Sequence, residues 1–328
     1  MPKTIYITTI ILISAWLLAS CGSDSADDVQ RPVEKQNQEI SFKADVWKMA
    51  EATRATMYDN ALLKDGENGG FVCTAYNAGT IIPNDYAKID GTSVTWNESR
   101  SRWAFSDGSH YWPTSGNLDF FAYAPRTASL PDYVTVYYAV DGTPAAAAPH
   151  FTCADLPLSL TPSDATQEFI WALTTGQNRL DQGESGVTMT FRHPFARVKF
   201  KKSASSSTNV TVTSITIPAI YRDGTCTLTG TGNTATSTWS GWDDNDEGIE
   251  ITGSPATSDD TFYLVIPNNY GSKTLSVAIT WKEWDVEDSQ TLTAPLDFNW
   301  AAGYSYTYSL TITKDDLKVD IEKFTEQW

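Results

Sequence analysis

The residue with the most specific chemical surroundings is Cys21, which closes the run Leu18-Ala19-Ser20-Cys21. Lys3 precedes an apolar stretch from Ile5 to Leu18 that is shorter than the ~20 residues needed to span a bilayer. Small residues at this place suit a signal peptidase. We therefore predict a signal peptide over residues 1–20 and acyl chains on the Cys21 thiol, which anchor the chain to a membrane surface.

The remaining residue types favour no catalytic chemistry. The sequence contains no HExxH run, no GxSxG elbow and no phosphate-binding glycine loop. An acidic run over residues 243–247 begins like a calcium loop, but Ser254 occupies the twelfth position, where such a loop needs a bidentate glutamate. The isolated histidines are His110, His150 and His193. We expect these histidines to be structural, and we predict no enzyme, no metal site and no cofactor.

Cysteine spacing leaves one alternative open. Besides Cys21, the chain has Cys73, Cys153 and Cys226, which are widely spaced and have no CxxC partner. An odd number of cysteines does not form a disulfide framework, so we expect small buried thiols, with a single bridge as the alternative.

Aromatic residues raise the possibility of sugar binding, because the chain has 12 Trp and 15 Tyr. Trp281, Tyr304 and Tyr306 lie at alternating strand positions typical of a sheet core. Trp239 and Trp242 flank a Ser-Gly turn and are the better candidates for an exposed pair that contacts a glycan.

Charge limits the partners. The chain of 328 residues has a formal net charge of −17 and no Lys/Arg-rich block. Such acidity keeps a surface protein soluble and repels phosphate backbones, so no nucleic acid partner is expected.

The elements that position these residues are strands. Gly and Asp-Gly turns separate short apolar runs along the whole chain, which indicates an all-β fold. Alternation is clearest in two places, at Ile40, Phe42, Ala44 and Val46, and from Tyr304 to Thr313, where we expect a half-buried antiparallel strand. Residues 262–266 are apolar throughout and favour a central strand. Between 187 and 200 the apolar phase slips, which suggests a bulge near Pro194.

Several stretches together resemble the fimbrillin family over nearly the full chain. Besides the Cys21 motif and the residues before Thr53-Arg54-Ala55-Thr56, these stretches are Tyr111-Trp112-Pro113, residues 118–123, residues 190–198, residues 262–267 and Trp300 to Gly303. The resemblance implies a type V pilus subunit with two tandem transthyretin-like (Greek-key) β-sandwich domains. With the boundary placed in a polar, Gly-bearing stretch, we expect a tether and first strand at 21–54 and sandwiches at 55–186 and 187–328.

A cut after Arg54, before Ala55, would remove the strand Ile40 to Val46 together with the lipid. The resulting groove would have unpaired backbone and exposed core, which another subunit's strand can fill. The C-terminal residues Leu317, Val319, Ile321 and Phe324 form the candidate donor strand, or else they are the last strand of their own domain.

The expected protein is therefore a pilin, that is, a structural and adhesive subunit of a surface fimbria. It would be exported as a lipid-anchored precursor to the outer membrane, where its partners are other pilin subunits or copies of itself, with a host or bacterial surface ligand possible. The alternative is a surface glycan-binding lipoprotein that uses Trp239 and Trp242.

Replacing Cys21 tests the anchor. Cys21→Ala should abolish incorporation of an acyl-chain analogue during metabolic labelling and leave the signal uncleaved, because both steps need the thiol. A second cysteine substitution, Cys73→Ala, serves as control and should label normally. Label that persists in Cys21→Ala would contradict the lipidation prediction.

Overall fold

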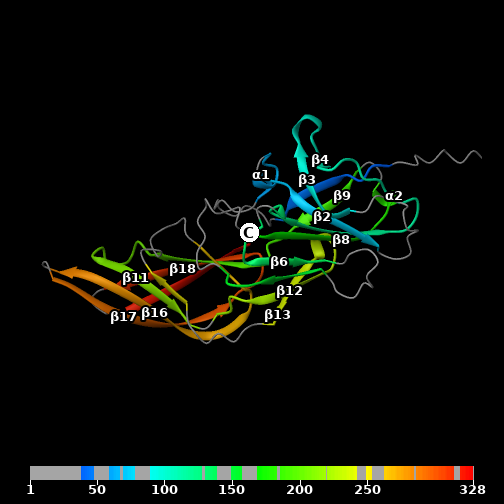
Figure 1. Cartoon of the computed structure of the whole chain (residues 1–328). Helices are drawn as coiled ribbons and strands as arrows, with labels where there is room; N and C mark the ends of the chain where they lie inside the picture. Colours follow the sequence, from blue (N-terminus) through cyan, green and yellow to red (C-terminus); the bar gives the residue numbers. More distant parts are fainter. Residues whose placement is uncertain are drawn as a thin grey trace, which may run out of the picture. The chain divides into compact units, whose positions relative to one another are not determined.

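The computed structural model is all-β (Figure 1). It describes residues 38–47, 59–66, 69–77, 89–127, 130–138, 149–156, 168–182, 185–218, 220–241, 249–252, 262–283, 286–313 and 318–327. Residues 37–328 form one compact unit.

The strands are, in chain order, β1 (Phe42–Val46), β2 (Phe71–Asn77), β3 (Ile89–Asn97), β4 (Arg102–Phe105), β5 (Leu118–Ala124), β6 (Val134–Tyr137), β7 (His150–Cys153), β8 (Ile170–Gln177), β9 (Val187–Phe191), β10 (Ala196–Lys202), β11 (Val210–Ile217), β12 (Gly224–Thr229), β13 (Thr236–Ser240), β14 (Ile249–Thr252), β15 (Tyr263–Val265), β16 (Asn269–Glu283), β17 (Val286–Asn299), β18 (Tyr304–Thr313) and β19 (Lys318–Gln327). Among the described residues there are two short α-helices, α1 (Asn60–Leu63) and α2 (Arg179–Gln182).

Strand β1 covers one face of a five-stranded sheet. That sheet has the order β4-β3-β2-β5-β8, and β1 pairs in parallel with β9 to form a separate two-stranded sheet. The side chains between these sheets form the first core, which includes Phe42 of β1, Phe71 of β2 and Phe191 of β9. In the described part of the chain, two strands thus close the first sandwich on one side, and β1 is one of them.

The five-stranded sheet is buried on both faces. Along β5, Phe120, Ala122 and Ala124 belong to the first core, whereas Phe121 and Tyr123 belong to a middle core on the opposite face. The sheet β13-β12-β7-β6 contributes side chains to this middle core, and β7 pairs with β12. A strand segment with a core on each face must be apolar at every position, which explains the apolar run from Phe120 to Ala124 in β5, after Asp119.

The second core lies between two four-stranded sheets, β15-β10-β18-β19 and β14-β11-β16-β17. Tyr306, Tyr308, Leu310 and Ile312 of β18 are buried in it, as their alternation predicts. The expectation of a purely antiparallel environment is wrong, because β18 pairs in parallel with β10 and antiparallel with β19. Residues 262–266 are not a central strand either: β15 is an edge strand, apolar because its two faces join the middle and second cores.

The phase slip near Pro194 marks a change of sheet. Strand β9 ends at Phe191 and lies in the first core, whereas β10 begins at Ala196 and lies in the second. The prediction of one bulged strand is therefore wrong. Residues 187–191 pack with the strands that precede the expected boundary at 186/187, so the exact boundary between the two sandwiches stays a prediction.

Removing the central side chain of β1 should destabilise the chain strongly. Phe42 is 5% exposed, so Phe42→Ala leaves a cavity in the first core and should lower the free energy of unfolding by about 3–5 kcal/mol. The exposed neighbour Lys43→Ala should change it by less than about 0.5 kcal/mol. Urea unfolding measures both, and equal effects would contradict this account of the first core.

Candidate functional site

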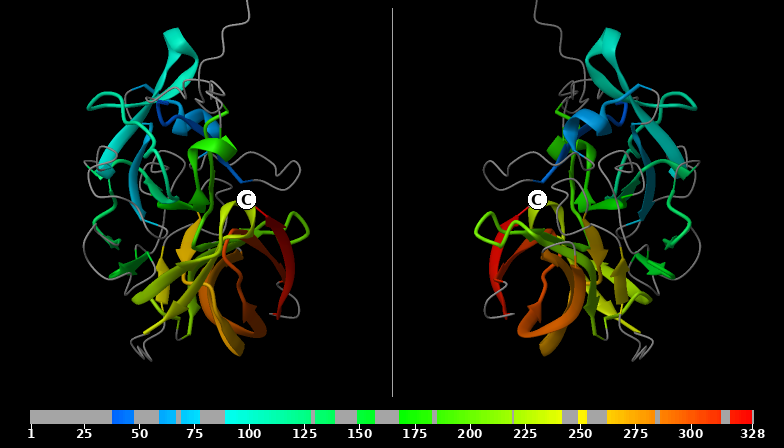
Figure 2. Two further views of the ribbon diagram at one scale, coloured as in Figure 1. Left: turned by 90° about the vertical axis from the view of Figure 1, so that its right-hand side faces the viewer. Right: turned by 90° about the vertical axis from the view of Figure 1, so that its left-hand side faces the viewer.

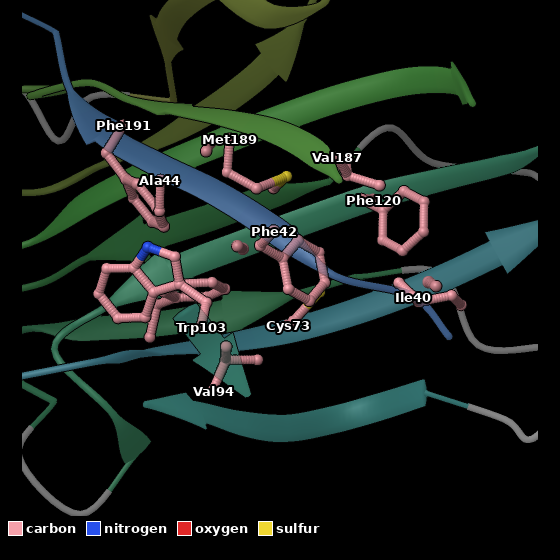
Figure 3. Close-up of a cluster of buried hydrophobic side chains, with 14 of the residues drawn as sticks. Ile40, Phe42, Ala44, Cys73, Val94, Trp103, Phe120, Val187, Met189 and Phe191 are labelled. Carbon is pink, nitrogen blue, oxygen red and sulfur yellow. The ribbon is translucent and has the colours of Figure 1, made fainter. Parts of the chain in front are cut away.

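The candidate site is the groove that holds β1. The side chains Ile40, Phe42, Ala44 and Val46 are between 2% and 5% exposed. The Phe42 ring makes edge contacts with three rings of the five-stranded sheet, at centroid distances of 5.3 Å to Phe105, 5.7 Å to Phe71 and 5.8 Å to Phe120. Figure 3 shows β1 above Trp103 and Cys73, with Val187, Met189 and Phe191 of β9 beside it. The groove is therefore an apolar slot with an aromatic floor.

Backbone hydrogen bonds hold the strand on one side. Val187 N donates to Ser41 O at 2.7 Å, and Trp47 N donates to Phe191 O at 2.8 Å. These bonds bracket the parallel ladder with β9, whose register runs from Phe42 opposite Val187 to Val46 opposite Phe191.

Other contacts tie down the two ends of the strand. At its start, Ile40 N donates to His110 O at 2.7 Å, and Arg102 pairs with Glu39 at 3.3 Å. At its end, Val46 N donates to the Asn60 side-chain oxygen at 2.6 Å. Asn60 begins α1, whose first turn is capped by the Asp59 carboxylate. Contacts with His110, Arg102 and Asn60 thus hold both ends of β1 in place.

An arginine contacts the residue that directly follows β1. The Arg192 guanidinium carbon lies 4.5 Å from the centroid of the Trp47 ring, directly after β1 and β9 end. Burial lowers the pKa of Arg192 from its ordinary value, although the group stays a cation at neutral pH. The contact fixes where the chain leaves the first core.

The C-terminal strand β19 is an edge strand of the sheet β15-β10-β18-β19 (Figure 2). It pairs antiparallel with β18 along its whole length, from Tyr304 opposite Gln327 to Thr313 opposite Lys318. Phe324 is 50% exposed and lies opposite Thr307, whereas Val319 and Ile321 lie opposite residues of the second core. Alternation therefore puts position 324 on the other face from positions 319 and 321.

The structure overturns the expected exposed tryptophan pair. Trp239 is 8% exposed, and its indole N–H donates to Pro194 O at 2.9 Å. Its ring packs on Phe151 and Phe195 in the middle core. The alternation of β13 produces this burial, which the adjacent Ser-Gly turn concealed. Trp242 lies outside the described residues.

The histidines are held by neighbouring side chains. His193 Nδ1 lies 2.6 Å from Glu168 Oε1, and both groups are buried. His110 is bonded to Asp107 at 2.9 Å, and His150 stacks on Tyr137 with ring centroids 4.9 Å apart.

The described cysteines are Cys73, Cys153 and Cys226, and all are buried free thiols whose pKa burial raises. The described ranges contain no group of three or more His, Cys, Asp or Glu residues that could hold a metal ion.

Several predicted sites fall outside the described part of the chain, namely Cys21, Arg54, Ala55 and Leu317. In the described part, no helix has the length and apolar character to cross a membrane.

The chain belongs to the fimbrillin-like family, whose model matches residues 53–328. Its fold is similar to that of a fimbrial protein from Bacteroides vulgatus, with 17% identity, a TM-score of 0.57 and coverage of 89% of this chain and 100% of that one. A protein assigned to cell adhesion from Bacteroides ovatus gives 17% identity, a TM-score of 0.49 and coverage of 89% and 98%. No curated protein matches. Family membership supports a fimbrial subunit, part of an appendage on the cell surface.

The bond at the end of β1 can be tested separately. Asn60→Ala leaves the buried Val46 N–H without its acceptor and should cost about 1–3 kcal/mol of unfolding free energy. Asn233→Ala, at an exposed position in the turn before β13, should change it by less than about 0.5 kcal/mol. Urea unfolding of both variants decides; equal midpoints would show that Asn60 does not hold the strand.

Proposed function

We propose that this chain is a non-enzymatic pilin that accepts a strand from another subunit in the groove of β1. The observation that supports this most is that β1 fills an apolar slot with four buried side chains, yet precedes the family match, which begins at residue 53. Arg54 lies between β1 and α1 in the sequence, so a cut after it would detach β1 from the rest of the chain.

The energetics favour replacement of the strand over an empty groove. Burying a large apolar side chain contributes about 1.5–3 kcal/mol, so loss of Ile40, Phe42 and Val46 leaves several such sites exposed to water. Loss of β1 also leaves one edge of β9 without its ladder. A second strand that carries apolar residues at every other position restores both contributions.

Lipidation belongs to the same proposal. A precursor anchored through Cys21 would stay at the outer membrane until the cut at Arg54–Ala55 releases both lipid and strand. This single cleavage would then end the membrane anchoring and start the capacity to polymerise.

The donor we propose is the C-terminal strand, with Leu317, Val319, Ile321 and Phe324 as its candidate residues. Donation is costly for this chain, because β18 would lose the pairing partner along its outer edge. If β19 stays in its own sheet, the subunit accepts a strand without giving one and would then stand at an end of the fimbria, as tip or anchor.

Limited proteolysis tests the proposal. A trypsin-like protease should cut the purified chain first at Arg54–Ala55, and the product should form oligomers or bind an added peptide of residues 316–328. Arg54→Ala should prevent both outcomes, whereas Arg100→Ala, an exposed arginine after β3, should change neither. N-terminal sequencing identifies the cut, and size-exclusion chromatography with light scattering reports the oligomers.

The contrary outcome is equally clear. If the cut protein stays monomeric, binds no peptide and melts at the same temperature as the uncut chain, β1 is not the plug of an acceptor groove. The glycan-binding alternative would be favoured by polysaccharide binding that is unchanged by cleavage.

A further inference from the structure

A pocket of about 440 Å³ lies beside β1, and Ser185, just before β9, also lines it. Its walls come from β1, from β3 and β4, and from Lys64 at the end of α1, elements that lie next to one another in Figure 1. This volume is within the range of small-molecule sites, about 300–1,000 Å³. The pocket adjoins the groove that β1 fills, because Phe42, Ala44 and Trp103 belong to both.

One wall is a fixed aromatic surface. Trp96 of β3 is half-buried, and its ring meets the buried Trp103 of β4 edge-on, with centroids 5.4 Å apart. The Lys64 ammonium lies 4.5 Å from the centroid of the Trp96 ring. The Lys64 ammonium thus covers part of one face of the indole, and a ligand that stacks on Trp96 meets a ring already fixed in position, at little cost in side-chain entropy.

The charge of the pocket is opposite to that of the chain. Lys43, Lys64 and Arg102 line it, against the single carboxylate of Asp45. Arg102 forms a salt bridge with Glu39, which offsets its charge, so the two lysines supply the main positive charge. A cationic pocket on a chain of net charge −17 favours a ligand that carries a negative charge.

The dimensions exclude an inserted peptide strand. The Cα atoms of β1 and β4 come within 8 Å of one another. A strand paired to both edges needs twice the spacing of about 4.8 Å. The hydroxyl groups of Ser41 and Ser101 in the lining suit a ligand with hydroxyl groups of its own instead.

We propose that this pocket binds a carboxylate-bearing sugar, namely a hexuronic acid residue of a glycan. The apolar face of the sugar ring would stack on Trp96, and its carboxylate would lie between Lys43 and Lys64. The uncut chain would then bind a glycan, and a cut after Arg54 would remove Lys43 and the β1 wall of the pocket. This inference does not rest on strand exchange.

Calorimetric titration of the uncut full-length chain with a galacturonic acid oligosaccharide, and with the matching neutral galactose oligosaccharide, tests the proposal. We expect measurable binding of the acidic sugar only. Trp96→Ala should weaken it about tenfold or more, which corresponds to about 1.4 kcal/mol, and Lys43→Gln should weaken it severalfold. Tyr137→Ala, which removes a 46% exposed ring from another sheet, and Lys273→Gln on β16 are the matched controls and should bind like the unaltered chain.

Several results would overturn the proposal. Equal affinity for the neutral sugar would remove the role of the carboxylate, and unchanged binding by Lys43→Gln would remove the role of the cations. Binding of an acidic peptide but of neither sugar would assign the pocket to a protein partner. If Trp96→Ala also lowers the melting temperature, its weaker binding no longer tests the pocket by itself. The binding of Lys43→Gln then decides, since Lys43 is exposed and outside the core. Because β1 stays in place throughout, failure here leaves the strand-exchange proposal untouched.

Discussion

The interaction on which the rest depends is the burial of one face of β1 against the first core. Among the described strands, this one and β9 cover that face of the five-stranded sheet, and Phe42 is in contact with three of its aromatic rings. Apolar burial is the largest favourable term available to a strand of five residues, whereas a single parallel ladder contributes little by itself. The first sandwich is therefore complete only while some strand occupies this place.

The two edges of β1 serve different purposes. One edge joins β9 and closes the core, while the other faces a cationic pocket with a tryptophan wall. The same short segment thus links the stability of the first sandwich to the proposed ligand site. A strand that replaced β1 would restore the core if it were apolar at alternate positions, but it would bring its own residues to the places of Lys43 and Asp45.

Alternation along the sequence was enough to predict the strands that lie on one core. Ile40 to Val46 and Tyr304 to Thr313 each have one buried face, so the period of two identifies both strands and their inner residues. The all-β class followed from the same patterns, whereas the family came from the resemblance of several stretches along the chain. For the functional groove, the pattern identified the side chains of β1 but gave no partner, because its pairing with β9 joins residues more than a hundred positions apart.

Predictions failed where a strand touches two cores or where the chain changes sheet. The apolar run 262–266 has a core on each face, so its composition is that of a central strand although β15 lies at an edge. Trp239 stands beside a turn, yet its place on β13 turns it inward. The sequence did not predict the pocket at Trp96, because its lysines and tryptophans come from elements that only the fold brings together.

Hydrogen exchange tests the central claim most directly. The amide of Val187, which donates to Ser41, should be strongly protected in the full chain. In a chain that begins at Ala55 the protection of β9 and of the first core should fall, while β16 and β18 in the second core keep theirs. Adding the peptide that fills the groove should restore the protection of β9. Unchanged protection of Val187 without β1 would contradict the account, because the first sandwich would then be complete without that strand.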